Sequence, residues 1–495
     1  MKNIHRNIAF SGLGYILPLL ASLATIPLMI KYMGEDVYGL YIICISLIGF
    51  MTFVDLGVGQ AIVKYVSQYE VTGENTKIKP ILDIALMMYV VLGISIAALV
   101  ALFSLPLGKL IYNADTVKAV MAGKALSITA LAFLLSYINQ FFLNVFKAYH
   151  RFDIPAVIQN SANIAGIVSA TVLVLLGYDL LVILWGYVII QVVALTAGYI
   201  LGKRVLPVGV VLGLSFDRHI FAEMLSFSIY TFVSNFLGGI VSRLDKFIIG
   251  AILGTEAVTY YQIPHTIAQM ANGIIQVLSQ ITFPRFSELS SLNDTVGRLA
   301  LYKRSMLLVF LASMGIAVAL ISAGGAFLEL WISAEFALKS TLTLQIIALY
   351  FFFQSNTVVA YWALQGSGNA KVTALSSFLG TVAYLVGIYF LTQYYGYNGA
   401  AMSLFLLLTP MPYFYSWVER NVGHKFSEYL LLTGLFVVFG LLIVLGLSQL
   451  HRFMPSNALF ILVDGIVLTG VIGAALSYLF REELRLRFRS SVNYK

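Results

Sequence analysis

Three charged residues inside one apolar stretch of the chain are the first candidates for chemistry. Arg243, Asp245 and Lys246 lie well within residues 226–254, which read SFSIYTFVSNFLGGIVSRLDKFIIGAILG and are long and apolar enough to cross a bilayer. An ionisable side chain at that depth costs at least about 2.5 kcal/mol to insert, so it should face a partner or a hydrated cavity. The pattern predicts a cationic site for an anionic ligand.

Helical geometry divides these charges between two faces. At about 100° per residue, Asn235 and Lys246 fall in one narrow wedge, Arg243 lies beside it, and Asp245 points to the other side. We therefore expect Arg243, Lys246 and Asn235 to bind substrate, and Asp245 to serve coupling or charge pairing. A neutralised packing cluster, with each charge paired to another helix, is the alternative. Two cations and one anion leave a positive charge over, which favours the ligand.

A polar stripe follows on the next predicted helix, at about residues 257–283. We expect Gln269, Asn272 and Gln276 in this stripe to bind substrate as one wall of a hydrated cavity. The alternative is interhelical bonding, because amides hold transmembrane helices together at roughly 0.6–2 kcal/mol each. The stripe comprises Gln262, His265, Gln269, Asn272, Gln276 and Gln280.

The first half of the chain adds two charged residues within predicted spans. Lys124 is a further candidate for substrate binding, and we expect Asp55 to pair with a basic group, coupling of its protonation to transport being the alternative. No nucleophile elbow, phosphate-binding glycine loop or paired metal-ligand motif occurs in a suitable context, so we expect neither an enzyme nor a metal site. Cys44 is the only cysteine, which excludes a disulfide within the chain.

These residues need a membrane scaffold to position them. Of the 495 residues, 60% are hydrophobic and 11% are charged, whereas soluble domains have about 25% charged residues. Continuous apolar runs of about 20 or more residues favour helices over a closed barrel. We predict an all-α polytopic membrane protein with about 14 transmembrane helices, at approximately residues 8–33, 38–62, 81–103, 119–146, 156–176, 180–202, 226–254, 257–283, 305–328, 340–363, 372–394, 398–418, 429–450 and 457–480.

The basic residues predict the orientation of these helices. Of the 30 Lys and Arg residues, 22 fall in segments predicted inside, 5 in segments predicted outside and 3 within spans. Under the positive-inside rule this places both termini in the cytoplasm, in a bacterial cytoplasmic membrane.

The chain also repeats itself at an offset near 220 residues. Residues 30–41 align with 250–261, residues 110–118 with 330–338, and Gly177 with Gly396. Six spans separate the copies, so the copies keep one orientation. We predict a six-helix lobe at 1–203, a second, parallel six-helix lobe at 219–418, and two additional helices with a basic tail at 419–495.

Four segments resemble the polysaccharide transporter family of the multidrug/oligosaccharidyl-lipid/polysaccharide exporter superfamily, which includes O-antigen and capsule flippases. They are NIAFSGLGYILPLLASLATIPLMIKYMGEDVYGLY near the start, FVDLGVGQAIVKY in the second span, SRLDKFIIGAILG around Arg243, and LELWISAEF after the ninth span. The resemblance implies two MATE-like lobes around a central cavity. It also implies movement of an undecaprenyl-diphosphate-linked oligosaccharide to the outer face by alternating access, with basic cavity residues on the diphosphate or an acidic sugar.

Three other functions stay open. The additional helix pair resembles the fourteen-span lipid II flippases. A cation-coupled multidrug extruder is expected to carry acidic groups in its cavity, whereas the cluster here has one net positive charge. A membrane glycosyltransferase or polymerase usually needs a substantial extramembrane loop, and no loop here exceeds about 23 residues.

The partners follow from the same reasoning. They are the polyprenyl-diphosphate-linked oligosaccharide and membrane lipids, with polysaccharide polymerase and chain-length machinery as further candidates. Basic residues are scattered through short loops, so no nucleic acid is expected. No cofactor is expected either, and coupling to H⁺ or Na⁺ is left open.

Overall fold

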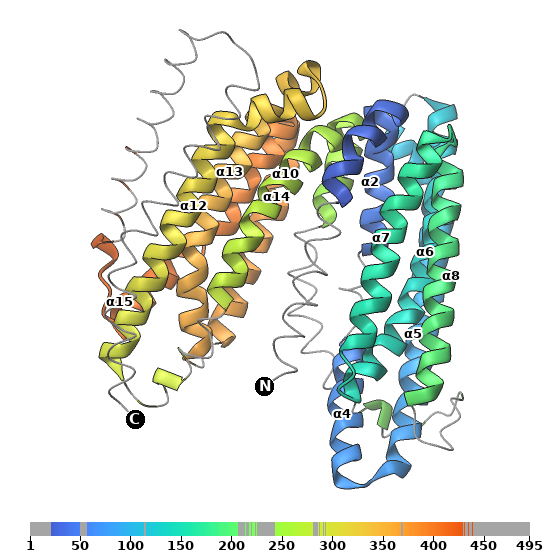
Figure 1. Cartoon of the computed structure of the whole chain (residues 1–495), viewed down its shortest axis with the longest axis horizontal. Helices are drawn as coiled ribbons and strands as arrows, with labels where there is room; N and C mark the ends of the chain where they lie inside the picture. The colour runs from blue at the N-terminus through green and yellow to red at the C-terminus, as the bar shows by residue number, and fades with distance from the viewer. Residues whose placement is uncertain are drawn as a thin grey trace. The chain divides into compact units, whose positions relative to one another are not determined.

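A computed structural model of the 495-residue chain describes residues 21–49, 57–112, 115–205, 243–280, 294–367 and 370–428, with single positions between 213 and 224, 286 and 292, and 430 and 438. Within these ranges every regular element is a helix and no strand occurs (Figure 1). The chain divides into two compact units, Met1–Thr259 and Tyr260–Lys495. The lobe boundaries drawn from the sequence stay a prediction.

Unit 1 contains long helices joined by short turns. A short apolar helix at Ala21–Met33 precedes them. Glycines with positive φ, at Gly34, Gly73 and Gly177, allow the chain to turn between several of these helices. The elements are α2 (Glu35–Gly49), α4 (Val58–Thr72), the 3₁₀ turn η1 (Asn75–Lys77), α5 (Ile78–Tyr112), α6 (Thr116–Ala148), α7 (Asp153–Leu175) and α8 (Leu180–Val205), followed by a helix at residues 243–253.

Unit 2 holds most of α10 (Thr255–Gln280), whose first residues belong to unit 1. Ser333 caps the N-terminus of α13 (Ala334–Gly366), because its hydroxyl accepts a hydrogen bond from the Phe336 amide at 3.1 Å. The other elements are α12 (Thr295–Trp331), α14 (Ala370–Ser403), the 3₁₀ turn η2 (Leu404–Leu408) and α15 (Met411–Asn421).

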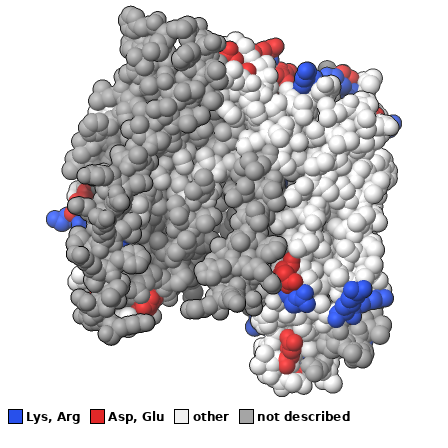
Figure 2. Space-filling model, in the orientation of Figure 1, with Lys and Arg blue, Asp and Glu red and all other residues white. Residues whose placement is uncertain are grey.

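Seven helical segments in the described part of the chain are long and apolar enough to cross a membrane. They are α5, α6, α7, α8, α12, residues 334–365 of α13, and the run from Leu375 to Asn421. Each coincides with one or two of the predicted spans. On the visible face of unit 1, charged side chains gather at the two ends of the helices and leave an uncharged band between them (Figure 2). The prediction of an all-α polytopic membrane protein is confirmed.

Several helices differ from their predicted bounds, and α12 begins at Thr295, ten residues before the predicted span at 305–328. The third span was expected to end near residue 103, but α5 continues to Tyr112 through Pro106. Its last turns are held by packing, since Gly108 lies directly against the backbone of α6 at Ala119. The eleventh and twelfth spans meet at a sharp kink instead of a loop, because Gly396 adopts φ 62° and ψ −150°.

The internal repeat appears at equivalent turns. Gly34 and Gly254, aligned by the offset near 220 residues, have φ of 78° and 86°. Gly177 and Gly396, aligned by nearly the same offset, have φ of 81° and 62°. Most side chains are strained at positive φ, so glycine suits all four positions, the turns at Gly34, Gly177 and Gly254 and the kink at Gly396.

Aromatic side chains fill the core of unit 1 between α5 and α6. Tyr89, Tyr137 and Phe141 are fully buried, and the Tyr89 and Tyr137 rings lie 5.0 Å apart. Asn144 donates a hydrogen bond to the Tyr89 hydroxyl at 3.0 Å. This polar residue of α6 therefore joins two helices.

Candidate functional site

Arg243 is the first described residue of the helix at residues 243–253 and packs against the end of α2. A methyl group added to Gly49 would lie only 2.5 Å from the guanidinium carbon Cζ. The guanidinium therefore occupies the space that any other residue at position 49 would fill. Gly49 is the local reason that a long cationic side chain fits beside α2 inside the membrane unit.

The charge on Arg243 is only partly neutralised by its surroundings. Arg243 is half-buried, and the titratable groups whose charges act on it are Asp245 and Tyr187 of α8. Among the residues that the structure describes, none forms an ion pair or hydrogen bond with its guanidinium. A guanidinium whose donors have no partner among the described residues is suited to binding an anion.

Asp245 and Lys246 pair with each other. The Lys246 ammonium lies 2.8 Å from Asp245 Oδ1, and both side chains are almost completely buried. The same carboxylate oxygen accepts a hydrogen bond from the Lys246 backbone amide at 2.8 Å. The expectation that Asp245 faces away from the cations is therefore wrong for Lys246. Side-chain flexibility explains this, since adjacent residues diverge by about 100° at the backbone but a lysine is long enough to fold back.

This pairing assigns the net positive charge of the cluster to Arg243. Lys246 and Asp245 neutralise one another, as the packing-cluster interpretation expected. Arg243 is then the cation of this cluster that can bind an anionic ligand. Binding of substrate by Lys246 stays a prediction that the buried pair makes less favourable.

The polar stripe of α10 contains residues in different environments. Asn272 is buried, donates to Gln354 Oε1 of α13 at 3.2 Å, and accepts a hydrogen bond from the Ser355 hydroxyl at 2.5 Å. Asn272 therefore holds α10 and α13 together, as in the interhelical alternative. Gln269 is exposed and Gln276 is half-buried. Their binding of substrate stays a prediction, and the three belong to unit 2, whereas Arg243 belongs to unit 1.

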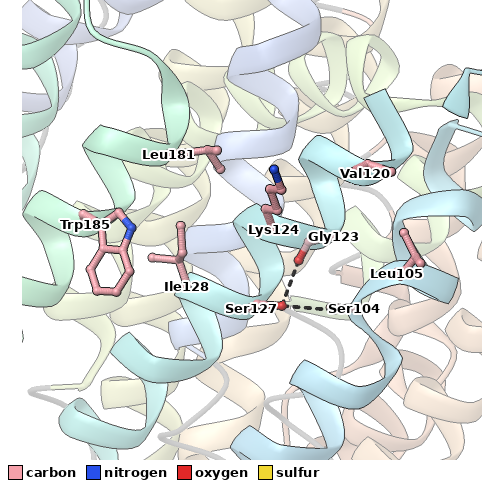
Figure 3. A pocket seen from close by; sticks show the side chains of 9 residues that line it. All are labelled: Ser104, Leu105, Val120, Gly123, Lys124, Ser127, Ile128, Leu181 and Trp185. Atoms are coloured by element: carbon pink, nitrogen blue, oxygen red, sulfur yellow. Dashed lines mark hydrogen bonds between the residues drawn. The ribbon is translucent and has the colours of Figure 1, made fainter. Parts of the chain in front are cut away.

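Lys124 lines a separate cavity of unit 1. The cavity has a volume of about 460 Å³ and lies between α5, α6 and α8 (Figure 3). Arg243, Asp245 and Lys246 are not among its lining residues. The sequence alone could not show that Lys124 lies apart from Arg243 and Lys246, because all three are charged residues within apolar runs. Asp55 and Asn235, the remaining candidates, lie outside the described residues.

One polar cluster was missed by sequence reasoning. Asp36, in the first turn of α2, accepts hydrogen bonds from Lys118 at 2.7 Å, from Tyr112 at 3.0 Å and from the Thr255 hydroxyl. Burial raises the pKa of Asp36, but the hydrogen bonds from Lys118, Thr255 and Tyr112 outweigh it and leave the pKa below the usual value. The only signal in the sequence was the aligned pair of turns, whose first copy contains Asp36 and whose second contains Thr255.

A second buried carboxylate was also missed. Asp83 of α5 is completely buried, pairs with Lys79 at 2.6 Å, and accepts a hydrogen bond from the Gly213 amide at 2.7 Å. Gly213 belongs to the segment that joins the two predicted lobes. The spacing of Lys79 and Asp83, four residues apart at the start of a helix, was the available signal.

Comparison with known proteins gives one matching family and several similar folds. The family described as "Polysaccharide biosynthesis protein" matches residues 4–290. A protein of Shigella flexneri named "Putative O-antigen transporter" is 23% identical over 406 residues, which is 81% of this chain and 94% of that protein.

Two solved structures share the fold. The lipid II flippase MurJ in an inward closed conformation has a TM-score of 0.74 at 15% identity, covering 96% of this chain and 100% of the other. An inward-facing multidrug resistance MATE family transporter of the MOP superfamily has a TM-score of 0.58 at 12% identity, covering 88% of this chain and 95% of the other. These likenesses show the fold.

Proposed function

Because the chain belongs to the polysaccharide biosynthesis protein family, we propose that it is a flippase for an undecaprenyl-diphosphate-linked oligosaccharide. In this proposal the protein lies in a bacterial cytoplasmic membrane with both termini inside, and moves the saccharide outward by alternating access. No bound cofactor or metal takes part. The polytopic helical fold and the name of the Shigella flexneri relative support the proposal.

Arg243 is the observation that carries this proposal. A diphosphate cannot cross hydrocarbon unaided, because an unpaired charge there is strongly disfavoured. A guanidinium presents a planar fork of donors that fits two oxygens of a phosphate or carboxylate. Arg243 offers such a fork within an apolar unit, and its charge is only partly neutralised because Asp245 pairs with Lys246.

Two relatives in fold suggest other cargoes. The likeness to MurJ makes a lipid II flippase the second candidate, since lipid II also carries a diphosphate. A multidrug extruder for cations is less favoured, because a positive site repels cationic drugs. A membrane glycosyltransferase or polymerase is less favoured, because it usually needs a substantial extramembrane loop and no loop between the predicted spans exceeds about 23 residues.

Reconstitution tests the cargo directly. Purified protein in proteoliposomes is given three probes in parallel: a fluorescent undecaprenyl-diphosphate oligosaccharide, fluorescent lipid II, and a lipophilic cationic dye. We expect the oligosaccharide to cross fastest and unchanged in mass. Faster movement of lipid II would favour the second candidate function, a lipid II flippase. Movement of the dye alone would overturn the proposal, and a change in saccharide mass would identify an enzyme.

A further inference from the structure

The cavity that contains Lys124 lies near one end of unit 1. It is formed where α5 ends and where α6 and α8 begin, since Tyr112, Thr116 and Leu180 mark the same end of these helices. At about 1.5 Å per residue, Lys124 lies about 12 Å along α6 from Thr116, and Trp185 about 8 Å along α8 from Leu180. Lysine and tryptophan at such depths are typical of the boundary between lipid head groups and acyl chains.

One charge and many apolar groups line this cavity. Lys124 is the only charged residue of the lining, it is exposed, and no described residue forms an ion pair or hydrogen bond with it. In Figure 3 its side chain extends from α6 between Trp185 and Leu181 on one side and Leu105 and Val120 on the other. A cavity with a single unpaired cation and apolar walls is complementary to an anion that is attached to a hydrocarbon chain.

Two hydroxyl groups form the polar floor. Ser127 lies within 3.0 Å of both the Ser104 hydroxyl and the Gly123 carbonyl, and Ser104 donates to the Ala101 carbonyl at 2.7 Å (Figure 3). Both hydroxyl protons are therefore used within the protein, and the remaining lone pairs can hold water. Lys124 is consequently the group that must supply the direct contact to an anion.

The cavity exists because α5 and α6 approach closely beneath it. A methyl group on Gly123 would lie 3.3 Å from the Leu105 Cα atom, and one on Gly108 would lie 2.3 Å from the Ala119 carbonyl oxygen. These glycines bring the backbones of α5 and α6 together at the floor, and Leu181 and Trp185 of α8 complete the lining. The rim is apolar and exposed at Leu105, Val120 and Trp185, with exposed fractions of 42%, 42% and 49%.

We infer that this cavity binds the phosphate of an anionic glycerophospholipid from the surrounding bilayer. The Lys124 ammonium holds the phosphate, and an acyl chain lies against Ile128, Leu181 and Trp185. The apolar, exposed rim favours a membrane lipid over a soluble anion, because a soluble anion gains nothing from the hydrocarbon walls. A head group held there would fix the ends of α5, α6 and α8 relative to the membrane surface.

Quenching of Trp185 by brominated lipid tests this inference. The full-length protein is placed in bilayers of phosphatidylcholine that contain either dibrominated phosphatidylglycerol or dibrominated phosphatidylcholine at equal mole fractions. The signal of Trp185 is taken as the difference between the parent and Trp185→Phe, because the chain has four tryptophans. We expect the anionic lipid to associate about fivefold more strongly, the effect of one exposed lysine near an anionic membrane surface.

Matched variants identify the contributing charge. Lys124→Gln should reduce the preference to about one, and Lys124→Arg should keep it, which also shows that a substitution at 124 is compatible with folding. Lys109→Gln is the control, because Lys109 is an exposed cation near the same end of α5 that does not line the cavity. Equal quenching by both lipids in the parent, or an unchanged preference in Lys124→Gln, would overturn the inference.

Competition distinguishes a bilayer lipid from other phosphates. Inorganic phosphate at millimolar concentration should not displace the brominated phosphatidylglycerol, and neither should undecaprenyl diphosphate at low mole fraction. Displacement by inorganic phosphate would show a soluble-anion site. Displacement by undecaprenyl diphosphate would instead make the cavity a substrate site, which contradicts the bilayer-lipid inference and leaves the proposed transport function standing.

Discussion

Arg243 is the residue whose chemistry separates a ligand site from a charged packing site. If its guanidinium binds two oxygens of a diphosphate, Arg243→Ala should weaken binding of the lipid-linked oligosaccharide by about 10–100-fold, the value of a charge-assisted hydrogen-bond pair. Arg243→Lys should lie between Ala and the parent, because an ammonium keeps the charge and loses the fork. The measurement is export of the saccharide, normalised to the amount of protein in the membrane.

The exposed Arg151 supplies a matched control for the Arg243 variants. Arg151 pairs with Asp153 at 3.0 Å on the surface, and Arg151→Ala should leave export per molecule close to that of the parent. Normal export per molecule in Arg243→Ala would remove Arg243 from the binding site.

Lys246 should behave differently from Arg243, because it is paired. Lys246→Gln leaves Asp245 buried without its cation, and breaking a buried pair costs about 3–5 kcal/mol. We expect less folded protein in the membrane, with export per remaining molecule largely kept. The double variant Asp245→Asn/Lys246→Gln should restore abundance, because it removes both charges together. Quantitative immunoblotting measures this, and a single variant as abundant as the parent would contradict the structural role of the pair.

At the scale of elements, the approach of α5 to α6 depends on glycine. A Cβ atom at Gly108 would lie 2.3 Å from the Ala119 carbonyl oxygen, so Gly108→Ala must push the helices apart, at about 1–3 kcal/mol. Gly186→Ala is the control, because its Cβ would meet only the end of the flexible Leu173 side chain at 3.1 Å. The midpoint of thermal unfolding in detergent should fall for Gly108→Ala and stay nearly constant for Gly186→Ala. Equal midpoints would contradict the packing argument.

The junction between α12 and the segment after α15 should respond to pH through His424. His424 is buried, its ring centroid lies 5.2 Å from that of Tyr302, and Lys303 and Glu428 are the charged groups near it. Burial lowers the pKa of His424, opposed by Glu428 and assisted by Lys303. Its neutral form is therefore favoured by folding.

The sign of the pH effect follows from this lowered pKa. Near pH 7.5 the ring is neutral in both states, and below about pH 6.5 the unfolded chain takes up a proton that the folded protein resists. Stability should fall as pH decreases from 7.5 to 5.5, by about 2 °C or more in the unfolding midpoint. His424→Phe should reduce that decrease, whereas the exposed His150→Gln should not. An unchanged pH dependence in His424→Phe would count against this assignment.

Apolar length and glycine positions predicted the elements better than charge predicted the site. Hydrophobic runs located α6, α7 and α8 within a few residues, because a helix in lipid must satisfy its own backbone hydrogen bonds. The continuation of α5 through Pro106 was not predictable, since it depends on contact with α6. The pairing of Asp245 with Lys246 was missed for a related reason. Helical geometry fixes the direction of the Cβ atom, but the position of a long side chain's end also depends on its tertiary contacts.

At the scale of the whole molecule, the internal repeat aligns glycines that share a positive φ. The glycines at 34 and 254 and those at 177 and 396 have positive φ in both copies. Repetition of a six-helix set keeps its orientation in the membrane, so the halves should present equivalent turns to the same side. The parallel arrangement of the two lobes is a prediction, and single-cysteine labelling tests it.

The last prediction tests that arrangement with single cysteines. Val117 and Leu338 lie in the aligned segments, and their exposed fractions are 81% and 87%. Val71 is 84% exposed and lies at a turn predicted to face the cytoplasm. The buried Cys44 is the only native thiol, so Cys44→Ala supplies a clean background. In intact cells with a permeable outer membrane, an impermeant maleimide should label Val117→Cys and Leu338→Cys, and should label Val71→Cys only after the cytoplasmic membrane is opened. Labelling of only one of the first two would show inverted halves, and labelling of Val71→Cys alone in intact cells would reverse the predicted orientation of the termini.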